Sequence, residues 1–154
     1  DVLGRFQNCF LVREPATALR SFARRWPDFT DEEAGWDAMG RTADVVESLG
    51  QPLVVVDAAE LCSDPAGVVA AWCAAMDLPF LERSLTWEPG MRPEWELWSD
   101  WHAATAESSG FRPLQGDASA PEEPRLRGVY ERAARVYQRL LEHSVGPDDP
   151  QPQP

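Results

Sequence analysis

The chain of 154 residues contains no lysine, so all fourteen of its basic side chains are arginine. This absence excludes chemistry that needs a lysine amine, such as formation of a Schiff base. The sequence also lacks a glycine-rich phosphate loop of the Gly-x-x-x-x-Gly-Lys kind. No apolar run approaches the ~20 residues that a membrane-spanning helix needs, and we therefore expect no membrane partner.

Cysteine is scarce as well. Cys9, Cys62 and Cys73 are an odd number of thiols without the spacing of metal ligands. We therefore expect buried free thiols, no metal site and a reducing, cytoplasmic location.

Positive charge is in short supply over the whole chain, which has 26 acidic residues and a net charge of −12. This balance opposes nonspecific binding to nucleic acid or to an anionic membrane. Against that background, Arg13, Arg20, Arg24 and Arg25 lie within thirteen residues, with only Glu14 opposing them. The cluster is either a solvated helix face or a local anion site.

The apolar pattern predicts a helix-rich α/β domain over residues 1–145, followed by a disordered tail at 146–154. Two apolar runs, at about 7–13 and 53–57, predict parallel strands joined by a helical crossover. The expected helices cover residues 15–26, 30–50, 65–76, 94–108 and 123–143. Asp57 and Asp64 stand where they would cap the helices that follow them.

Arg13 stands at the exit of the first expected strand, and Pro15 starts the helix behind it. The guanidinium is a planar fork of donors that suits phosphate, and ligands of open α/β sheets gather at this edge. Ser21 follows eight residues after Arg13, about 9 Å along the helix axis if Pro15 begins it. These residues favour an anion site over the solvated face.

The segment Arg13-x-Pro15 with Ser21 resembles the 3′-phosphate-binding segment of the sulfotransferase family. The resemblance continues downstream in the style of bacterial sulfotransferase-like proteins and covers roughly residues 6–112. Its further pieces are Pro27-Asp28-Phe29-Thr30, Pro52 to Asp57, Trp87-Glu88-Pro89-Gly90 and Ser108-Ser109-Gly110-Phe111.

The resemblance implies a partial, P-loop-related three-layer fold and transfer of a sulfuryl group from 3′-phosphoadenosine 5′-phosphosulfate to the hydroxyl or amine of a small molecule. In it, Arg13 and Ser21 hold the 3′-phosphate, and Arg20 or Arg24 assists. Family members open with a strand, a phosphate loop and a helix that hold the 5′-phosphosulfate. We therefore expect the carboxyl-terminal part of such a protein, in which a second copy, an amino-terminal partner segment or a helix covers the free edge of strand 7–13.

Trp95, Trp98, Trp101 and His102 lie on one side of the expected helix 94–108. They form either an acceptor-binding wall with His102 as a proton shuttle or an aromatic core stripe with one satisfied histidine. Whether the chain is an enzyme stays open, because it lacks the phosphate loop. The alternatives are a non-catalytic truncated relative that serves as a binding or assembly module and, less favoured without a Walker lysine, a kinase-like nucleotide binder.

Overall fold

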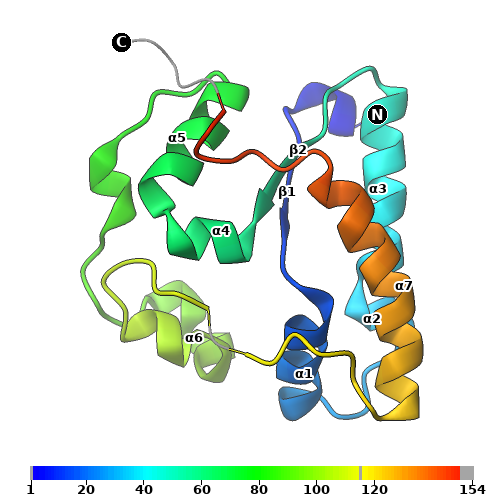
Figure 1. Cartoon of the computed structure of the whole chain (residues 1–154). Helices are drawn as coiled ribbons and strands as arrows, with labels where there is room; N and C mark the ends of the chain where they lie inside the picture. The colour runs from blue at the N-terminus through cyan, green and yellow to red at the C-terminus, as the bar shows by residue number, and fades with distance from the viewer. Residues whose placement is uncertain (1, 115, 150–154) are drawn as a thin grey trace.

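The computed structural model describes residues 2–114 and 116–149 and shows two short strands surrounded by helices (Figure 1). The elements, in chain order, are η1 (Leu3–Arg5), β1 (Cys9–Val12), α1 (Pro15–Arg25), α2 (Asp31–Ala34), α3 (Trp36–Ser48), β2 (Val54–Asp57), α4 (Ala58–Ser63), α5 (Pro65–Ala75), η2 (Glu82–Leu85), η3 (Pro93–Trp98), α6 (Ser99–Ala106) and α7 (Pro124–Leu141), where η marks a 3-10 helix. Within these ranges no helix is long and apolar enough to cross a bilayer.

The sheet consists of β1 and β2 in parallel, with Phe10 beside Val55. The segment after α7 runs along the other edge of β2: Val55 N–H donates to the His143 carbonyl at 3.2 Å, and Val145 N–H donates to the Val55 carbonyl at 2.8 Å. The predicted helix-rich α/β class with two parallel strands is confirmed. Among the described residues, β1 has no strand on its second edge.

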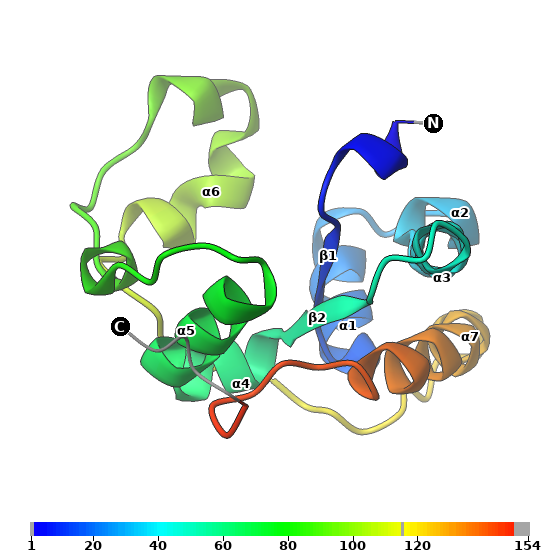
Figure 2. The same cartoon turned by 90° about the horizontal axis from the view of Figure 1, so that it is seen from above.

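Three layers result, with α3 and α7 on one face of the sheet and α4 and α5 on the other (Figure 2). β1 alternates, so that Phe10 and Val12 are buried while Cys9 and Leu11 are exposed. The buried side joins one core, whose other members include Trp36, Ala43, Val46, Val55, Ala133, Tyr137 and Leu140. The expectation of buried thiols is therefore wrong for Cys9, which lies on the open side of β1, and right for Cys73, where burial raises the pKa of the thiol.

The expected helix 30–50 is two helices. Thr30 and Glu33 form the predicted capping box of α2, but Gly35 then adopts φ 79° and ends it. The left-handed residue is a common helix stop, and a new helix, α3, starts at Trp36. In a similar way the expected helix 94–108 begins as the 3-10 turn η3 before it continues as α6.

The predicted caps of the next helices are confirmed. The Asp57 carboxylate accepts from Ala59 and Glu60 N–H, and Asp64 accepts from Gly67 N–H. Of the expected tail 146–154, residues 150–154 lie outside the described residues. Residues 146–149 form a turn, in which Gly146 N–H donates to Asp149 Oδ2 at 2.7 Å.

Candidate anion-binding site

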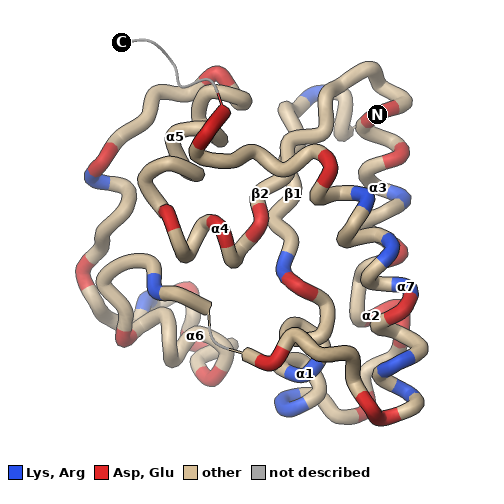
Figure 3. The backbone as a smooth tube through the Cα atoms, viewed as in Figure 1, with Lys and Arg blue, Asp and Glu red and all other residues tan. Residues whose placement is uncertain are grey.

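Three of the arginines predicted as a phosphate site line one cavity of about 480 Å³ beside the carboxyl end of β1. Basic positions gather along α1 at this end of the sheet (Figure 3). The lining residues are Arg13, Thr17, Arg20, Ala23, Arg24, Gly116, Asp117 and Leu126. The cavity therefore lies between α1, the start of α7 and the loop that precedes α7.

The helix α1 positions the cavity because its two faces differ. Leu19 is buried against Phe29 and Leu126 in a second apolar cluster, which fixes the helix on α7. Residues at spacings of three and four share a helix face, so Thr17, Arg20 and Arg24 present one side of α1 to the cavity. The helix α1 thus supplies one wall of the cavity and two of its cations, Arg20 and Arg24.

Arg13 stands where β1 passes into α1, and its side chain is half-buried. Its Nε is buried and has no hydrogen-bond partner among the described residues. A buried donor without a partner costs free energy, and for a charged group the cost is larger than the ~1–3 kcal/mol of a neutral one. An anionic oxygen in the adjoining cavity would supply the missing acceptor.

The amino terminus of α1 is closed to an external anion by Glu14. Its carboxylate accepts from Ala16 N–H and Thr17 N–H, both at 2.8 Å, and from the Thr17 hydroxyl at 2.9 Å. The positive end of the helix dipole is therefore already neutralised, and an anion here would depend on donors of the side chains. Sequence reasoning missed this role, although a glutamate directly before a proline that starts a helix is in the capping position.

Arg20 is tied to the loop opposite. It donates to the Asp117 backbone carbonyl, lies 3.4 Å from Asp117 Oδ2 and contacts Ser119 Oγ at 3.4 Å. Gly116 packs directly on α1, since a Cβ there would lie 2.4 Å from Thr17 Cγ2. Nothing in the sequence indicated that Asp117 would meet an arginine 97 positions away, because Asp117 lies in a loop outside any periodic pattern.

Arg24 differs from its neighbours on α1. It is exposed, lines the cavity and has no ion pair within residues 2–114 and 116–149. Arg25, the next residue, instead holds its guanidinium 5.3 Å from the centre of the Trp101 ring. Arg13 and Arg24 are thus the cavity cations that no described carboxylate neutralises.

Ser21 is half-buried on α1 and is not among the described residues that line the cavity. The structure therefore brings Arg13, Arg20 and Arg24 together and leaves the serine beside them on the helix. Its contact with a phosphate stays a prediction.

None of the tryptophans of η3 and α6 is buried. Neither element has a buried residue, and Trp98 is 56% exposed, so the interpretation as an aromatic core stripe is wrong. Trp95 stacks on His102 with ring centres 4.9 Å apart, and Trp101 reaches α1, 6.0 Å from Phe22. His102 does not line the arginine cavity among the described residues, and its role as a base stays a prediction.

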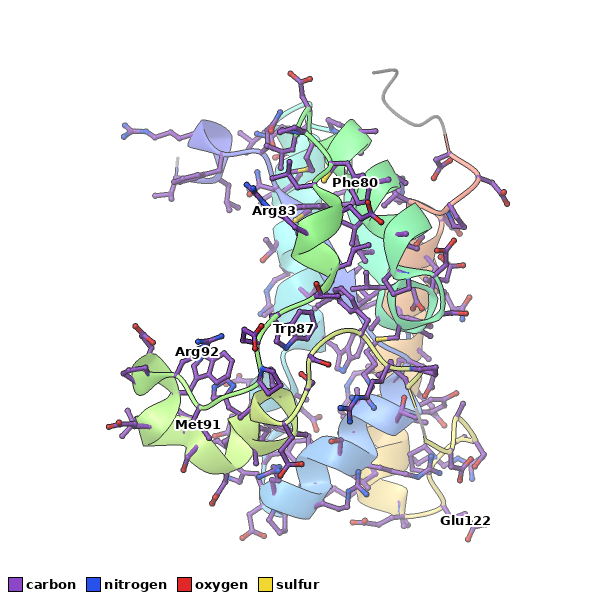
Figure 4. The ribbon with its side chains drawn as sticks, turned by 90° about the vertical axis from the view of Figure 1, so that its left-hand side faces the viewer. Phe80, Arg83, Trp87, Met91, Arg92 and Glu122 are labelled. Atoms are coloured by element: carbon purple, nitrogen blue, oxygen red, sulfur yellow. The ribbon has the colours of Figure 1, made fainter. Side chains whose placement is uncertain are left out.

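Trp87 connects the two ends of the segment that contains η3 and α6 (Figure 4). The indole N–H donates to Ser108 Oγ at 3.1 Å, and the ring lies edge-on to Phe111 at 5.4 Å. Thr86 and Gly110 pair as an antiparallel bridge beside it. Two pieces of sequence carried the family resemblance here, Trp87 to Gly90 and Ser108 to Phe111. They contact each other, so the segment 91–106 begins and ends at the same place in the structure.

The carboxyl end of β2 is acidic rather than basic. Asp57 is 4% exposed and accepts a 2.7 Å hydrogen bond from the Tyr137 hydroxyl. Burial, the hydrogen bond to Asp57 and the charges of Asp57, Glu14 and Glu60 all raise the pKa of Tyr137. The surroundings of Asp57 at the end of β2 therefore disfavour an anion, in contrast to the arginine cavity beside the end of β1.

Comparison with known families matches residues 5–138 to the sulfotransferase domain. The chain belongs to the sulfotransferase domain family. The matched range includes every described residue that lines the arginine cavity.

Two curated relatives come from Arabidopsis thaliana, and each is 30% identical to this sulfotransferase domain. They are branched-chain-amino-acid aminotransferase-like protein 2, over 116 residues or 75% of this chain, and branched-chain-amino-acid aminotransferase-like protein 1, over 149 residues or 93% of this chain. The aligned residues span only 21% and 26% of the length of these two relatives. No solved structure matches.

Proposed function

We propose that this sulfotransferase domain binds 3′-phosphoadenosine 5′-phosphosulfate and transfers its sulfuryl group to the hydroxyl or amine of a small molecule. Arg13 and Arg24 hold the 3′-phosphate in the arginine cavity. One observation carries the proposal: the half-buried Arg13 has a buried Nε without a described partner and lines a cavity of about 480 Å³ with a second unpaired guanidinium.

The charges of the cavity suit a phosphate monoester. Three arginines face one carboxylate, that of Asp117, so the cavity is locally positive in a chain whose net charge is −12. A guanidinium donates two parallel hydrogen bonds to phosphate oxygens, and such charge-assisted bonds are roughly twice as strong as neutral ones. The family resemblance adds the Ser21 hydroxyl as a further donor from α1.

The reaction proposed is an in-line displacement at sulfur. The acceptor oxygen or nitrogen forms a bond to sulfur, the bond from sulfur to the bridging phosphate oxygen breaks, and adenosine 3′,5′-bisphosphate leaves with the electron pair. The acceptor proton passes to a base, for which His102 is the candidate. Arg13 and Arg24 contribute by positioning the nucleotide through its 3′-phosphate, which is remote from the reacting atoms. The three free cysteines accord with a cytoplasmic location.

Calorimetric titration with adenosine 3′,5′-bisphosphate tests the site. Because a charge-assisted hydrogen bond is worth ~1.5–3 kcal/mol, we expect Arg13→Ala to weaken binding at least about tenfold. Arg25→Ala is the matched control, since Arg25 is a cation of the same helix that lies on Trp101 instead of in the cavity.

We expect the control to bind as the unaltered domain does. Thermal unfolding of both variants, followed by circular dichroism, separates lost binding from lost folding. Equal losses in the two variants, or an Arg13→Ala variant that is folded and binds normally, would contradict the proposal.

A further inference from the structure

The loop 116–119, which forms one wall of the arginine cavity, places the Asp117 carboxylate beside that cavity. Residues 116–119 cross α1, with Gly116 against Thr17 and with Asp117 and Ser119 on Arg20. Asp117 is the one acidic residue among the described residues that line the cavity. Its position is fixed twice, through its backbone carbonyl on Arg20 and through the Ser119 N–H that donates to Oδ1 at 2.9 Å.

The Asp117 side chain and a bound phosphate would compete for the same cation. Asp117 Oδ2 lies 3.4 Å from the Arg20 guanidinium, and both groups line the cavity in which we place the 3′-phosphate. Hydrogen bonds from Ser119, with a smaller contribution from Arg20, lower the pKa of Asp117, so the carboxylate is charged at neutral pH. Like charges that share a site repel each other, and the repulsion adds to the cost of freeing Arg20.

We infer that Asp117 is a built-in anionic competitor that sets how tightly the cavity holds the 3′-phosphate. The inference rests on the proposed function. Arg13 and Arg24 bind the phosphate first. The Arg20 guanidinium binds it only when the Asp117 carboxylate moves away from Arg20. The consequence is a nucleotide that stays exchangeable, because the carboxylate returns to Arg20 as the bisphosphate product leaves.

Asp117→Asn isolates this effect because it removes the charge and keeps the shape. The asparagine Oδ1 still accepts from Ser119 N–H, and the backbone carbonyl at position 117 still accepts from Arg20. The loop contacts on α1 are therefore retained. Glu122→Gln is the matched control: Glu122 is an exposed acid five positions further along the same segment and is not among the described lining residues (Figure 4).

The experiment is titration of the unaltered domain, Asp117→Asn and Glu122→Gln with adenosine 3′,5′-bisphosphate at low and high salt. We expect Asp117→Asn to bind about three- to tenfold more tightly at low salt, with a smaller gain at high salt, because salt screens exposed charges. Glu122→Gln should bind as the unaltered domain does.

The outcomes separate this inference from the proposed function. If the unaltered domain binds and Asp117→Asn binds equally or more weakly, the inference is overturned and the proposed site stands. Equal tightening by Glu122→Gln also overturns it, because net charge alone then explains the gain. If none of the three proteins binds, the proposed function is overturned and the inference with it.

Discussion

Two polar side chains at the carboxyl edge of the sheet differ in how their hydrogen bonds are satisfied. Asp57 is almost fully buried, and its oxygens accept from Tyr137 and from two backbone N–H groups of α4. Arg13 is half-buried, and its buried Nε has no described acceptor. Because nearly all buried polar groups in proteins are paired, Asp57 has a structural role, whereas the unpaired Nε of Arg13 supports the proposed contact with a phosphate.

The hydrogen bond between buried Tyr137 and Asp57 makes the free energy of unfolding fall at alkaline pH. The folded state raises the pKa of Tyr137 above the ordinary value of about 10, so the unfolded chain loses this proton first. The contribution is therefore complete below about pH 10 and is lost as the pH rises from there toward the folded value.

Tyr137→Phe removes the donor to Asp57 and should lower the free energy of unfolding at neutral pH by about 1–3 kcal/mol. It should also flatten the loss of stability above about pH 10. Urea unfolding at a series of pH values measures both effects, with Tyr130→Phe on the same helix as the control. An unchanged alkaline slope in Tyr137→Phe would show that the hydrogen bond does not control it.

Sequence reasoning found the cavity cations because they lie close together in the chain. Arg13, Arg20 and Arg24 follow from the end of a strand and the spacing of one helix. Asp117 and the packing of Gly116 on Thr17 depend on where a long loop returns, which no local pattern encodes. The position of Ser21 beside the cavity rather than in its lining likewise depends on how α1 rotates against α7.

At the scale of elements, helix stops decide where the predictions differ from the structure. The apolar spacing over 30–50 predicts one helix, and that spacing is present in α3. Gly35 takes the left-handed conformation between α2 and α3 and places Trp36 in the core. A glycine in a helical pattern is compatible with either outcome, so the break was not predictable from the spacing alone.

Two glycine substitutions test this account of the helix ends. Gly35→Ala places a residue with a Cβ at a backbone φ of 79° and should cost about 1–2 kcal/mol, although no atom beyond the two neighbouring residues lies within 4 Å of the added group. Gly128→Ala is the matched change, within the helical stretch of α7, and should stabilise the domain by up to ~1 kcal/mol because alanine is the better helix former. Chemical denaturation measures both, and the same sign in the two variants would contradict the assignment.

At the scale of the whole molecule, a strongly acidic chain brings two arginines without a described ion pair, Arg13 and Arg24, to one cavity. The acidic end of β2 and the capped start of α1 disfavour an anion at those two places, and the proposed anion site is the cavity between α1 and the loop 116–119. The second edge of β1 has no described strand, and Leu11 beside it is 61% exposed. Pairing of that edge with a second copy or an amino-terminal segment stays a prediction.

The central claim is that the Arg13 guanidinium binds a phosphate. The NMR signal of its own Nε–H group tests this most directly. We would record ¹⁵N–¹H spectra of the arginine Nε–H groups during titration with adenosine 3′,5′-bisphosphate and assign Arg13 by the signal lost in Arg13→Lys. We predict that the Arg13 signal shifts and that its proton becomes protected from exchange with water, while the Arg25 signal stays in place. An Arg13 signal that does not move at saturating nucleotide would contradict the account.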